Sequence, residues 1–302
     1  MQPDRRNFLG SAALAATGTA AAAGQQPPAA PARQDQPAAV QQPGRTPHTR
    51  FAPNLEMWWT RRPFIERMEQ AARLGYRGVE FWPWRGKDIA AIADASRRLN
   101  LEIAQFTAWG FRPGLNDPRN HGRFVEEVEA SCETARRLNC SLMCVVGGDD
   151  IIGVTQPRMH DAVIDGLRRV VPIVERHRIT LILEPMNIRV DHRGHCLYGS
   201  EPAVRIVRAV NSRYGKVLFD LYHNQITEGD LCGRLREGYP HLGYVQVADH
   251  PGRNEPGTGE INYTRVLKQL HDLGYRGYVG LELRPRRSEE DAAQAAYRVD
   301  QW

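Results

Sequence analysis

Eight short apolar runs alternate with segments of helical periodicity along residues 50–302, and this alternation limits the fold more than any other feature. The runs expected to form strands cover residues 51–57, 78–83, 102–109, 141–147, 180–187, 215–223, 242–249 and 278–285. The amphipathic stretches between them are clearest at 63–74, 121–138, 157–177, 200–210 and 262–273. Eight strand–helix units in about 250 residues predict a single (β/α)8 TIM barrel. A doubly wound open sheet is the alternative, but no Gly-x-Gly-x-x-Gly follows the first strand.

The residues before the barrel have the composition of an export signal followed by a linker. Arg5 and Arg6 precede Phe8 and an Ala-rich apolar stretch that ends in small residues, which is the order found in twin-arginine signal peptides. We therefore expect a twin-arginine signal peptide over 1–24, a disordered Pro/Gln/Ala linker over 25–49, and export to the periplasm. The apolar stretch is too short and too rich in Ala and Gly for a stable membrane span.

The net charge of +5 does not indicate a nucleic-acid partner. Residues 1–49 carry four Arg and two acidic residues, which leaves 36 basic and 33 acidic residues in the rest of the chain. That balance is typical of a solvated surface of mixed charge. The five cysteines have neither a disulfide framework nor zinc-site spacing, so Cys140 and Cys144 are expected to be small core residues.

Four of the last expected strands carry an oxygen-bearing side chain after an apolar run. These side chains are Glu184, Asp220, Gln246 and Glu282. The carboxyl ends of the strands form the catalytic mouth of a TIM barrel, so the four side chains should converge there. A set made only of oxygen donors suits one hard divalent cation, Mg²⁺ or Mn²⁺. The ordinary alternative is a separate salt bridge at the end of each strand.

The same residues suggest proton transfer. A cation that chelates a carbonyl and the adjacent hydroxyl acidifies the intervening C–H by stabilising the enediolate. Its charge lets Glu184 and Glu282 stay ionised, so that one can remove the proton and the other can return it to the neighbouring carbon. His223, expected at the end of the sixth strand, could donate to a substrate oxygen. Arg253, in a Gly/Pro-rich loop, and Arg189 are further candidates for substrate binding.

Aromatic and polar residues near the first three expected strands are less decisive. Indole rings suit the C–H faces of sugars, so we expect two of five tryptophans to line a pocket; the five are Trp58, Trp59, Trp82, Trp84 and Trp109. Packing in the barrel core is the alternative for each ring. The roles of Glu80, Gln105 and Tyr198 stay open.

Three longer motifs resemble bacterial hydroxypyruvate isomerases. They are the run Phe219-Asp220-Leu221-Tyr222-His223-Asn224-Gln225-Ile226-x-Glu228-Gly229-Asp230, the loop from Gln246 to Tyr263, and Gly274-Tyr275-x-Gly277-Tyr278-Val279-Gly280. The resemblance runs from Phe51 to Pro285, and it extends to the xylose isomerase-like barrel superfamily, which includes ketose 3-epimerases. It implies a divalent metal on the four strand-end residues, the two glutamates as the proton-transfer pair, and conversion of hydroxypyruvate to tartronate semialdehyde.

Several functions remain open beside a metal-dependent isomerase of a small hydroxy-keto acid or sugar. A ketose 3-epimerase could use the same two bases, and a non-catalytic exported sugar-binding protein would need neither. Abasic-site endonucleases share the barrel but need histidines where this chain has Glu80-Phe81-Trp82 and Phe106-Thr107-Ala108. We therefore expect a small-molecule partner and no nucleic acid, and the sequence leaves a homo-oligomer possible.

Overall fold

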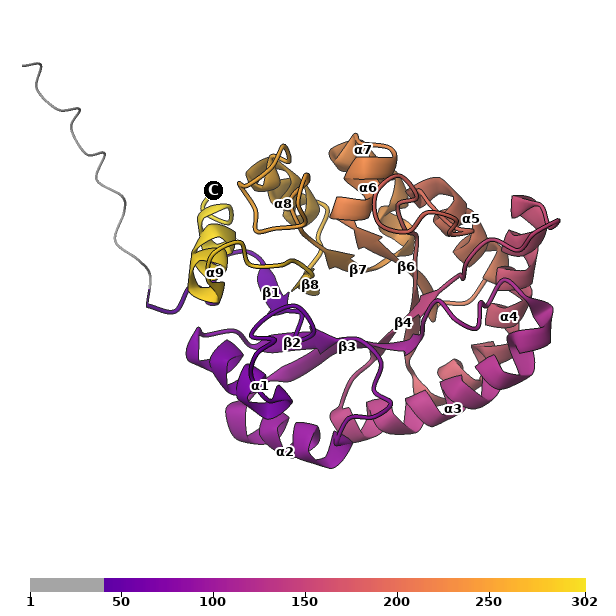
Figure 1. The fold of residues 1–302 in the computed structure, drawn as a ribbon, viewed down its shortest axis with the longest axis horizontal. Helices are drawn as coiled ribbons and strands as arrows, with labels where there is room; N and C mark the ends of the chain where they lie inside the picture. The colour runs from indigo at the N-terminus through magenta and orange to yellow at the C-terminus, as the bar shows by residue number, and fades with distance from the viewer. Residues whose placement is uncertain (1–40) are drawn as a thin grey trace, which may run out of the picture. The chain divides into compact units, whose positions relative to one another are not determined.

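The structure is a computed structural model that describes residues 41–302. The predicted signal peptide and residues 25–40 of the predicted linker lie outside the described residues. In the described part, eight parallel strands form one sheet in the order β1-β8-β7-β6-β5-β4-β3-β2, and nine α-helices accompany them (Figure 1). This architecture confirms the predicted TIM barrel. No helix in residues 41–302 has both the length and the apolar character needed to cross a membrane.

The strands are short and agree with the expected apolar runs. Their bounds are β1 (Arg50–Pro53), β2 (Gly78–Phe81), β3 (Glu102–Trp109), β4 (Leu142–Val146), β5 (Thr180–Glu184), β6 (Gly215–Asp220), β7 (Leu242–Gln246) and β8 (Tyr278–Leu281). The helices are α1 (Phe64–Arg73), α2 (Ile89–Leu99), α3 (His121–Leu138), α4 (Gln156–His177), α5 (Ser200–Val210), α6 (Leu221–Thr227), α7 (Leu231–Gly238), α8 (Tyr263–Asp272) and α9 (Glu289–Arg298).

The period of two along each strand determines which side chains face the barrel interior. Ile182, Leu218 and Tyr244 belong to one buried cluster with Ala52, Ala104, Cys144 and Val146. Each of the first three stands two residues before a strand-end candidate, so Glu184, Asp220 and Gln246 point to the same side of the sheet. The alternation therefore delivers the candidate side chains to the inside of the mouth.

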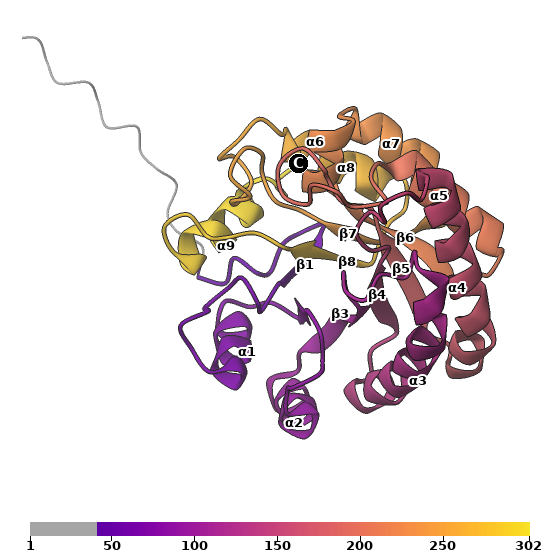
Figure 2. The same ribbon diagram turned by 45° about the vertical axis from the view of Figure 1, so that its right-hand side comes forward.

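The barrel closes by different contacts on the two sides of β1. A continuous parallel ladder joins β1 to β8, from Arg50 opposite Tyr278 to Pro53 opposite Leu281. Toward β2 there is one parallel bridge, between Asn54 and Glu80, and the Leu55 N–H donates to the Glu80 carbonyl at 2.8 Å. Figure 2 shows β1 beside β8. The seam between β1 and β2 is thus the least regular part of the sheet.

The predicted linker ends earlier than residue 49. The Gly44 N–H donates to the Leu74 carbonyl at 2.9 Å, and the N–H groups of His48 and Thr49 donate to Asp300 Oδ2 at 2.8 and 3.0 Å. Residues 41–49 therefore belong to the folded barrel. Their Pro/Gln/Thr-rich composition concealed this, because the contacts that hold the segment come from Leu74 and from Asp300, outside the segment itself.

The elements after β6 also differ from the expectation. The predicted strand run reached residue 223, whereas the strand ends at Asp220 and α6 begins at the next residue. The Asp220 carboxylate caps this helix by accepting from the N–H groups of Tyr222 and His223 at 2.8 and 3.4 Å. His223 accordingly lies on a helix and not at the end of a strand. The periodicity had also given no clear signal for α2, α7 or α9.

Candidate active site and metal centre

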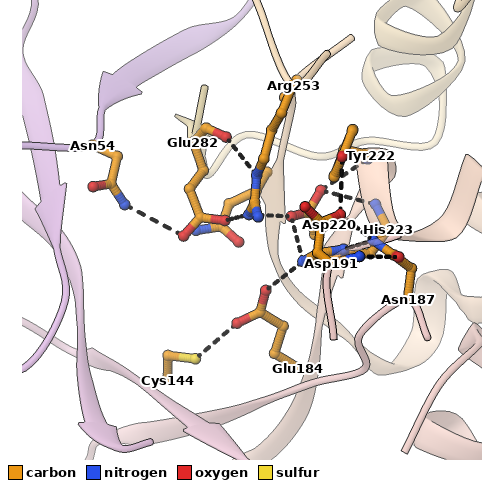
Figure 3. Close-up of polar contacts among 12 residues, drawn as sticks. Asn54, Cys144, Glu184, Asn187, Asp191, Asp220, Tyr222, His223, Arg253 and Glu282 are labelled. Carbon is orange, nitrogen blue, oxygen red and sulfur yellow. Dashed lines mark hydrogen bonds and ion pairs between the residues drawn. The ribbon is translucent and has the colours of Figure 1, made fainter. Parts of the chain in front are cut away.

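The predicted convergence of strand ends takes place at the mouth of the barrel. Glu184, Asp220 and Gln246 are the last residues of β5, β6 and β7, and Glu282 directly follows β8. All four are buried. One ligand atom from each of Glu184, Asp220, Glu282 and His223 lies within 4.8 Å of the others (Figure 3). Three carboxylates and one imidazole thus share a single small volume.

Gln246 keeps its amide oxygen free because its amide nitrogen is already engaged. Gln246 Nε2 donates to Glu80 Oε1 at 2.9 Å inside the barrel. Gln246 Oε1 is buried and has no hydrogen-bond partner among the described residues. The register places Gln246 opposite Asp220 on β6 and Gly280 on β7's other neighbour, β8. Glu80 therefore holds the amide nitrogen of Gln246 and leaves its oxygen as a free acceptor at the end of β7.

Asp220 divides its two carboxylate oxygens between structure and site. Oδ1 accepts the N–H groups at the start of α6. Oδ2 is buried without a hydrogen-bond partner in the described part of the chain, although Arg253 Nη2 and His223 Nε2 each approach it at 3.5 Å. A buried anionic oxygen left in this way is costly unless a cation or a donor compensates it.

The hydrogen bonds of Asn187 fix the tautomer of His223. Asn187 Oδ1 accepts from the backbone N–H groups of Val190 and Asp191 at 3.0 and 3.1 Å, so the other end of the amide is the donor. Asn187 Nδ2 lies 2.7 Å from His223 Nδ1, which must then accept. Burial, and next the positive charge of Arg253, hold the pKa of His223 well below its usual value, so the ring is neutral.

A neutral His223 with an accepting Nδ1 carries its hydrogen on Nε2. That atom is buried, has no hydrogen-bond partner among residues 41–302, and lies 3.9 Å from Glu184 Oε1 and 3.5 Å from Asp220 Oδ2. A protonated nitrogen cannot ligate a metal, although its position alone would allow it. We therefore assign His223 as a hydrogen-bond donor beside the cluster.

The carboxylates of the cluster strongly influence one another. Burial, then Glu282 and Asp220, raise the pKa of Glu184 well above its usual value. Burial raises the pKa of Asp220 to about 7, with Arg253 opposing and Glu282 adding to the shift. Like charges forced together in a dry site favour protonation unless a positive charge is present.

Arg253 is the positive side chain that reaches the cluster. It is largely buried, and its guanidinium donates to Glu282 Oε2 and lies 3.5 Å from Asp220 Oδ2. Burial alone would lower the pKa of Arg253, but the carboxylates led by Glu282 outweigh it and raise that pKa. One guanidinium balances one of the three carboxylates in contact, which leaves a net negative site.

The loop that carries Arg253 is held by a residue that the sequence did not single out. Asp249 is fully buried and accepts the N–H groups of His250, Gly257 and Ile261 at 3.0, 2.8 and 3.1 Å. Glu260, on the same loop, accepts from Gln225 Nε2 at 3.1 Å and from no loop N–H group among the described residues. In the sequence, this role of Asp249 was indicated only by its place between an apolar strand run and a Gly/Pro-rich loop.

The chemistry of these donors fits a divalent cation. The fit rests on the clustered carboxylates of Glu184, Asp220 and Glu282, on the orphaned Asp220 Oδ2, and on the free amide oxygen of Gln246, which ends the strand next to Asp220. All four are oxygen ligands, which hard cations prefer. Arg253 is the one positive side chain that pairs with these carboxylates among the described residues, and a cation would supply the further positive charge that they require. The residues predicted to hold a metal are therefore suitably placed to hold one.

A cavity of about 530 Å³ opens above the cluster and has room for a small organic ligand. Glu184, His223, Arg253 and Glu282 line one side of it, and Trp82, Thr107 and Phe111 line the other. Arg189 is exposed in the loop after β5 and does not line this cavity. The structure gives no support to Arg189 as a substrate contact.

Two of the five tryptophans line cavities. Trp82 Nε1 donates to Glu282 Oε1 at 2.6 Å and lines the cavity above the cluster, whereas Trp59 lines a neighbouring one. The other three pack within the protein: Trp58 and Trp109 are buried, and Trp84 Nε1 donates to Ser131 at 2.8 Å.

Sequence reasoning missed the loop residues Asn187, Asp191 and His192. Asp191 accepts from Asn187 Nδ2 at 2.8 Å and from the Tyr222 hydroxyl at 2.9 Å, and both Asp191 and His192 line the cavity. Their only signal was an unusually polar segment soon after Glu184. Glu80, left open earlier, is the buried partner of Asn54, Gln105 and Gln246.

Comparison with known proteins identifies the family to which this barrel belongs. The profile of the xylose isomerase-like TIM barrel family matches residues 68–299, and the chain belongs to this family. A crystal structure described as an AP endonuclease, family 2, from Brucella melitensis is 31% identical, with a TM-score of 0.76, and the match covers 81% of this chain and 96% of that one.

Two sequence relatives indicate the class of enzyme within this family. The chain is 32% identical to hydroxypyruvate isomerase of Escherichia coli strain K12, over 80% of this chain and 95% of the relative. It is 31% identical to 2-oxo-tetronate isomerase of Cupriavidus necator, over 78% of this chain and 93% of the relative. Together with the family match, these relatives identify the chain as an isomerase.

Proposed function

We propose that this isomerase is divalent-metal-dependent and moves a carbonyl between adjacent carbons of a small 2-oxo hydroxy acid. The observation that carries the proposal is the shared position of Glu184, Asp220 and Glu282, with buried oxygens of Asp220 and of Gln246, which ends the neighbouring strand, lacking partners. The names of the two relatives, hydroxypyruvate isomerase and 2-oxo-tetronate isomerase, support a small 2-oxo acid as the substrate class.

Each of the chain's own residues has a definite task in this reaction. Glu184 and Glu282 come from strands on different sides of the cluster, so one carboxylate can take a proton from one carbon and the other can deliver a proton to its neighbour. His223 Nε2–H is positioned to donate to a substrate oxygen. When bound, the cation would supply the positive charge that stabilises an enediolate.

Arg253 and the walls of the cavity bind and orient the substrate. The buried guanidinium of Arg253 lies against Glu282 and lines the cavity, so it can also meet the substrate carboxylate. Trp82 and Phe111 cover the opposite side and keep water from the reacting carbons. The arrangement confines a small acid between a charged wall and an aromatic one.

The proposal is tested by incubating the full chain with a panel of small 2-oxo acids and free ketoses in D₂O, with Mn²⁺, and following products by proton NMR. We expect an aldose–ketose type product from a 2-oxo acid, with deuterium at the carbon that receives the proton. EDTA should abolish turnover, and Mn²⁺ or Mg²⁺ should restore it. Activity in a metal-free sample would contradict the metal dependence.

The same panel separates the alternatives. Inversion at C3 of a free ketose, with no carbonyl shift, would identify a 3-epimerase that uses the same glutamates. Saturable binding of a sugar without any deuterium incorporation would favour a binding protein. Glu184→Gln serves as the control, because it keeps the size of the side chain and removes the base.

A further inference from the structure

A second and larger cavity lies next to the cavity above the metal cluster. Its volume is about 800 Å³, and it is formed by the loop after β1, the helix α1 and the loop after β8. Trp82 and Arg284 line both cavities. Arg284 stands two residues after Glu282, and Trp82 donates to that carboxylate. The two cavities are therefore neighbours across one indole ring.

Arginine dominates the lining of this second cavity. Five guanidinium groups contribute, those of Arg61, Arg62, Arg73, Arg284 and Arg287. Arg73 pairs with Glu290 at 2.5 Å and Arg62 lies 3.6 Å from Glu66. The side chains of Arg61, Arg284 and Arg287 have no ion pair or hydrogen bond with any residue of 41–302.

The three acidic residues of the lining are fewer than its five arginines, and none of them pairs with these three arginines. Glu56 pairs with Lys87 at 2.7 Å, and Glu290 pairs with Arg73. Glu289 Oε1 accepts the N–H of Trp59 at 2.8 Å. The cavity therefore carries a surplus of positive charge with free hydrogen-bond donors. Such guanidinium groups recognise carboxylate and phosphate oxygens by paired donation.

We propose that the arginine-lined cavity is a subsite for an anionic group at the far end of the substrate. This inference rests on the proposed isomerase function, because the reacting end is taken to lie at Glu184 and Glu282. A chain that starts there passes Trp82 and reaches Arg61, Arg284 and Arg287. The preferred substrate is then a 2-oxo sugar acid with a second anionic group, a carboxylate or a phosphate, beyond its reacting carbons.

The test compares two substrates that differ only at the far end, one with a terminal carboxylate and one with a terminal hydroxymethyl group. The Mn²⁺-loaded full chain should have a higher kcat/KM for the dianionic acid. The double variant Arg61→Ala/Arg287→Ala should lower that preference about tenfold and leave kcat/KM for the hydroxymethyl acid unchanged. Both residues lie outside the cavity above the cluster. A terminal phosphate in place of the carboxylate shows which anion is preferred.

Arg137→Ala is the matched control, because Arg137 is an exposed arginine on α3 without an ion pair in the described residues and outside both cavities. It should not change the preference. Equal kcat/KM for the two acids in the unaltered protein would overturn the proposal. So would a preference that survives in the double variant, or an equal loss on both acids.

Binding of inorganic phosphate, followed by tryptophan fluorescence, supplies a readout that needs no turnover, because Trp59 and Trp82 line the cavity. The unaltered chain should respond and the double variant should respond about tenfold more weakly. A phosphate response lost in the double variant, with no turnover of any acid, would refute the proposed reaction and support an anion site. No difference between the two proteins would refute the subsite.

Discussion

The two halves of the barrel mouth differ in how they contribute to the site. One half, the acidic half, is formed by the ends of β5 to β8 and supplies Glu184, Asp220, Gln246 and Glu282. The other half, the supporting half, is formed by the ends of β1 to β3 and supplies Asn54, Glu80, Gln105 and Trp82.

The difference shows that one half supplies the reactive side chains and the other half orients them. Side chains of the acidic half leave acceptors free toward a shared volume, as Asp220 Oδ2 and Gln246 Oε1 do. Those of the supporting half mostly hold other side chains: Glu80 accepts from Gln246, and Trp82 donates to Glu282. Ligands fixed by a second layer of hydrogen bonds are more precisely oriented and bind metal more tightly.

The largest effect is expected from the acidic half. Glu184→Gln and Glu282→Gln should each lower kcat about 100-fold to 10,000-fold, because each removes one proton-transfer group. The fold should persist, since glutamine keeps the shape and relieves repulsion among buried carboxylates. Steady-state kinetics and circular dichroism check both points. A single variant with normal kcat would rule out the mechanism of two glutamate bases.

Arg253→Ala should come next and lower kcat/KM about 100-fold, because it removes a buried cation from Asp220 and Glu282. Arg189→Ala is the matched control on an exposed arginine and should change kcat/KM within about twofold. Kinetics at saturating Mn²⁺ distinguish them. Similar losses in both variants would show that Arg189 reaches the substrate after all.

A conservative change in the supporting half should act through the metal. In Glu80→Gln, one acceptor oxygen is replaced by a donor, so the amides of Asn54, Gln105 and Gln246 can no longer all donate to residue 80. We expect Mn²⁺ affinity to fall about 10-fold to 100-fold. Isothermal titration with Mn²⁺ measures this directly. Unchanged affinity would mean that the supporting half does not orient Gln246.

The last effect concerns stability in the absence of metal. Burial raises the pKa of Asp220 to about 7, and burial followed by Glu282 raises that of Glu80 to about 7. The folded protein therefore holds protons that the unfolded chain, with carboxyl pKa values of about 4, has lost. The free energy of unfolding should therefore fall as pH rises from about 4 through about 7.

Thermal melts of the metal-free protein between about pH 5 and pH 8 check this trend. Mn²⁺ should flatten it, because a cation favours the ionised carboxylates. A melting temperature that rises with pH in the metal-free protein would contradict the raised pKa values of Asp220 and Glu80. The Glu80→Gln variant should lose its own part of the slope and so separate the contributions of the two halves.

The sequence predicts the acidic half well because each ligand closes an apolar run. Glu184, Asp220 and Gln246 end their strands as expected, and the period of two turns them inward. The (β/α)8 fold was predictable for the same reason, since alternation of strand and helix is a local property. The structure of residues 41–49 was not predictable in this way, because the hydrogen bond from His48 to Asp300 joins residues far apart in the sequence.

The supporting half and the loop after β5 depend on geometry that no local pattern encodes. Glu80 lies inside an apolar strand, where its partners Asn54, Gln105 and Gln246 come from three other strands or strand ends. Asn187 acts on His223 through a ring nitrogen whose protonation depends on the direction of one amide. Such roles become visible only when the donors and acceptors are placed in space.

The divided carboxylate of Asp220 makes the start of α6 a sensor of the cluster. One oxygen anchors the amides of Tyr222 and His223 while the other faces the place of the cation. Any shift of that carboxylate toward a bound ion is transmitted to the first turn of the helix. Deuterium uptake at the amides of Tyr222 and His223 therefore reports whether a cation is bound, and it needs no substrate and no attached probe.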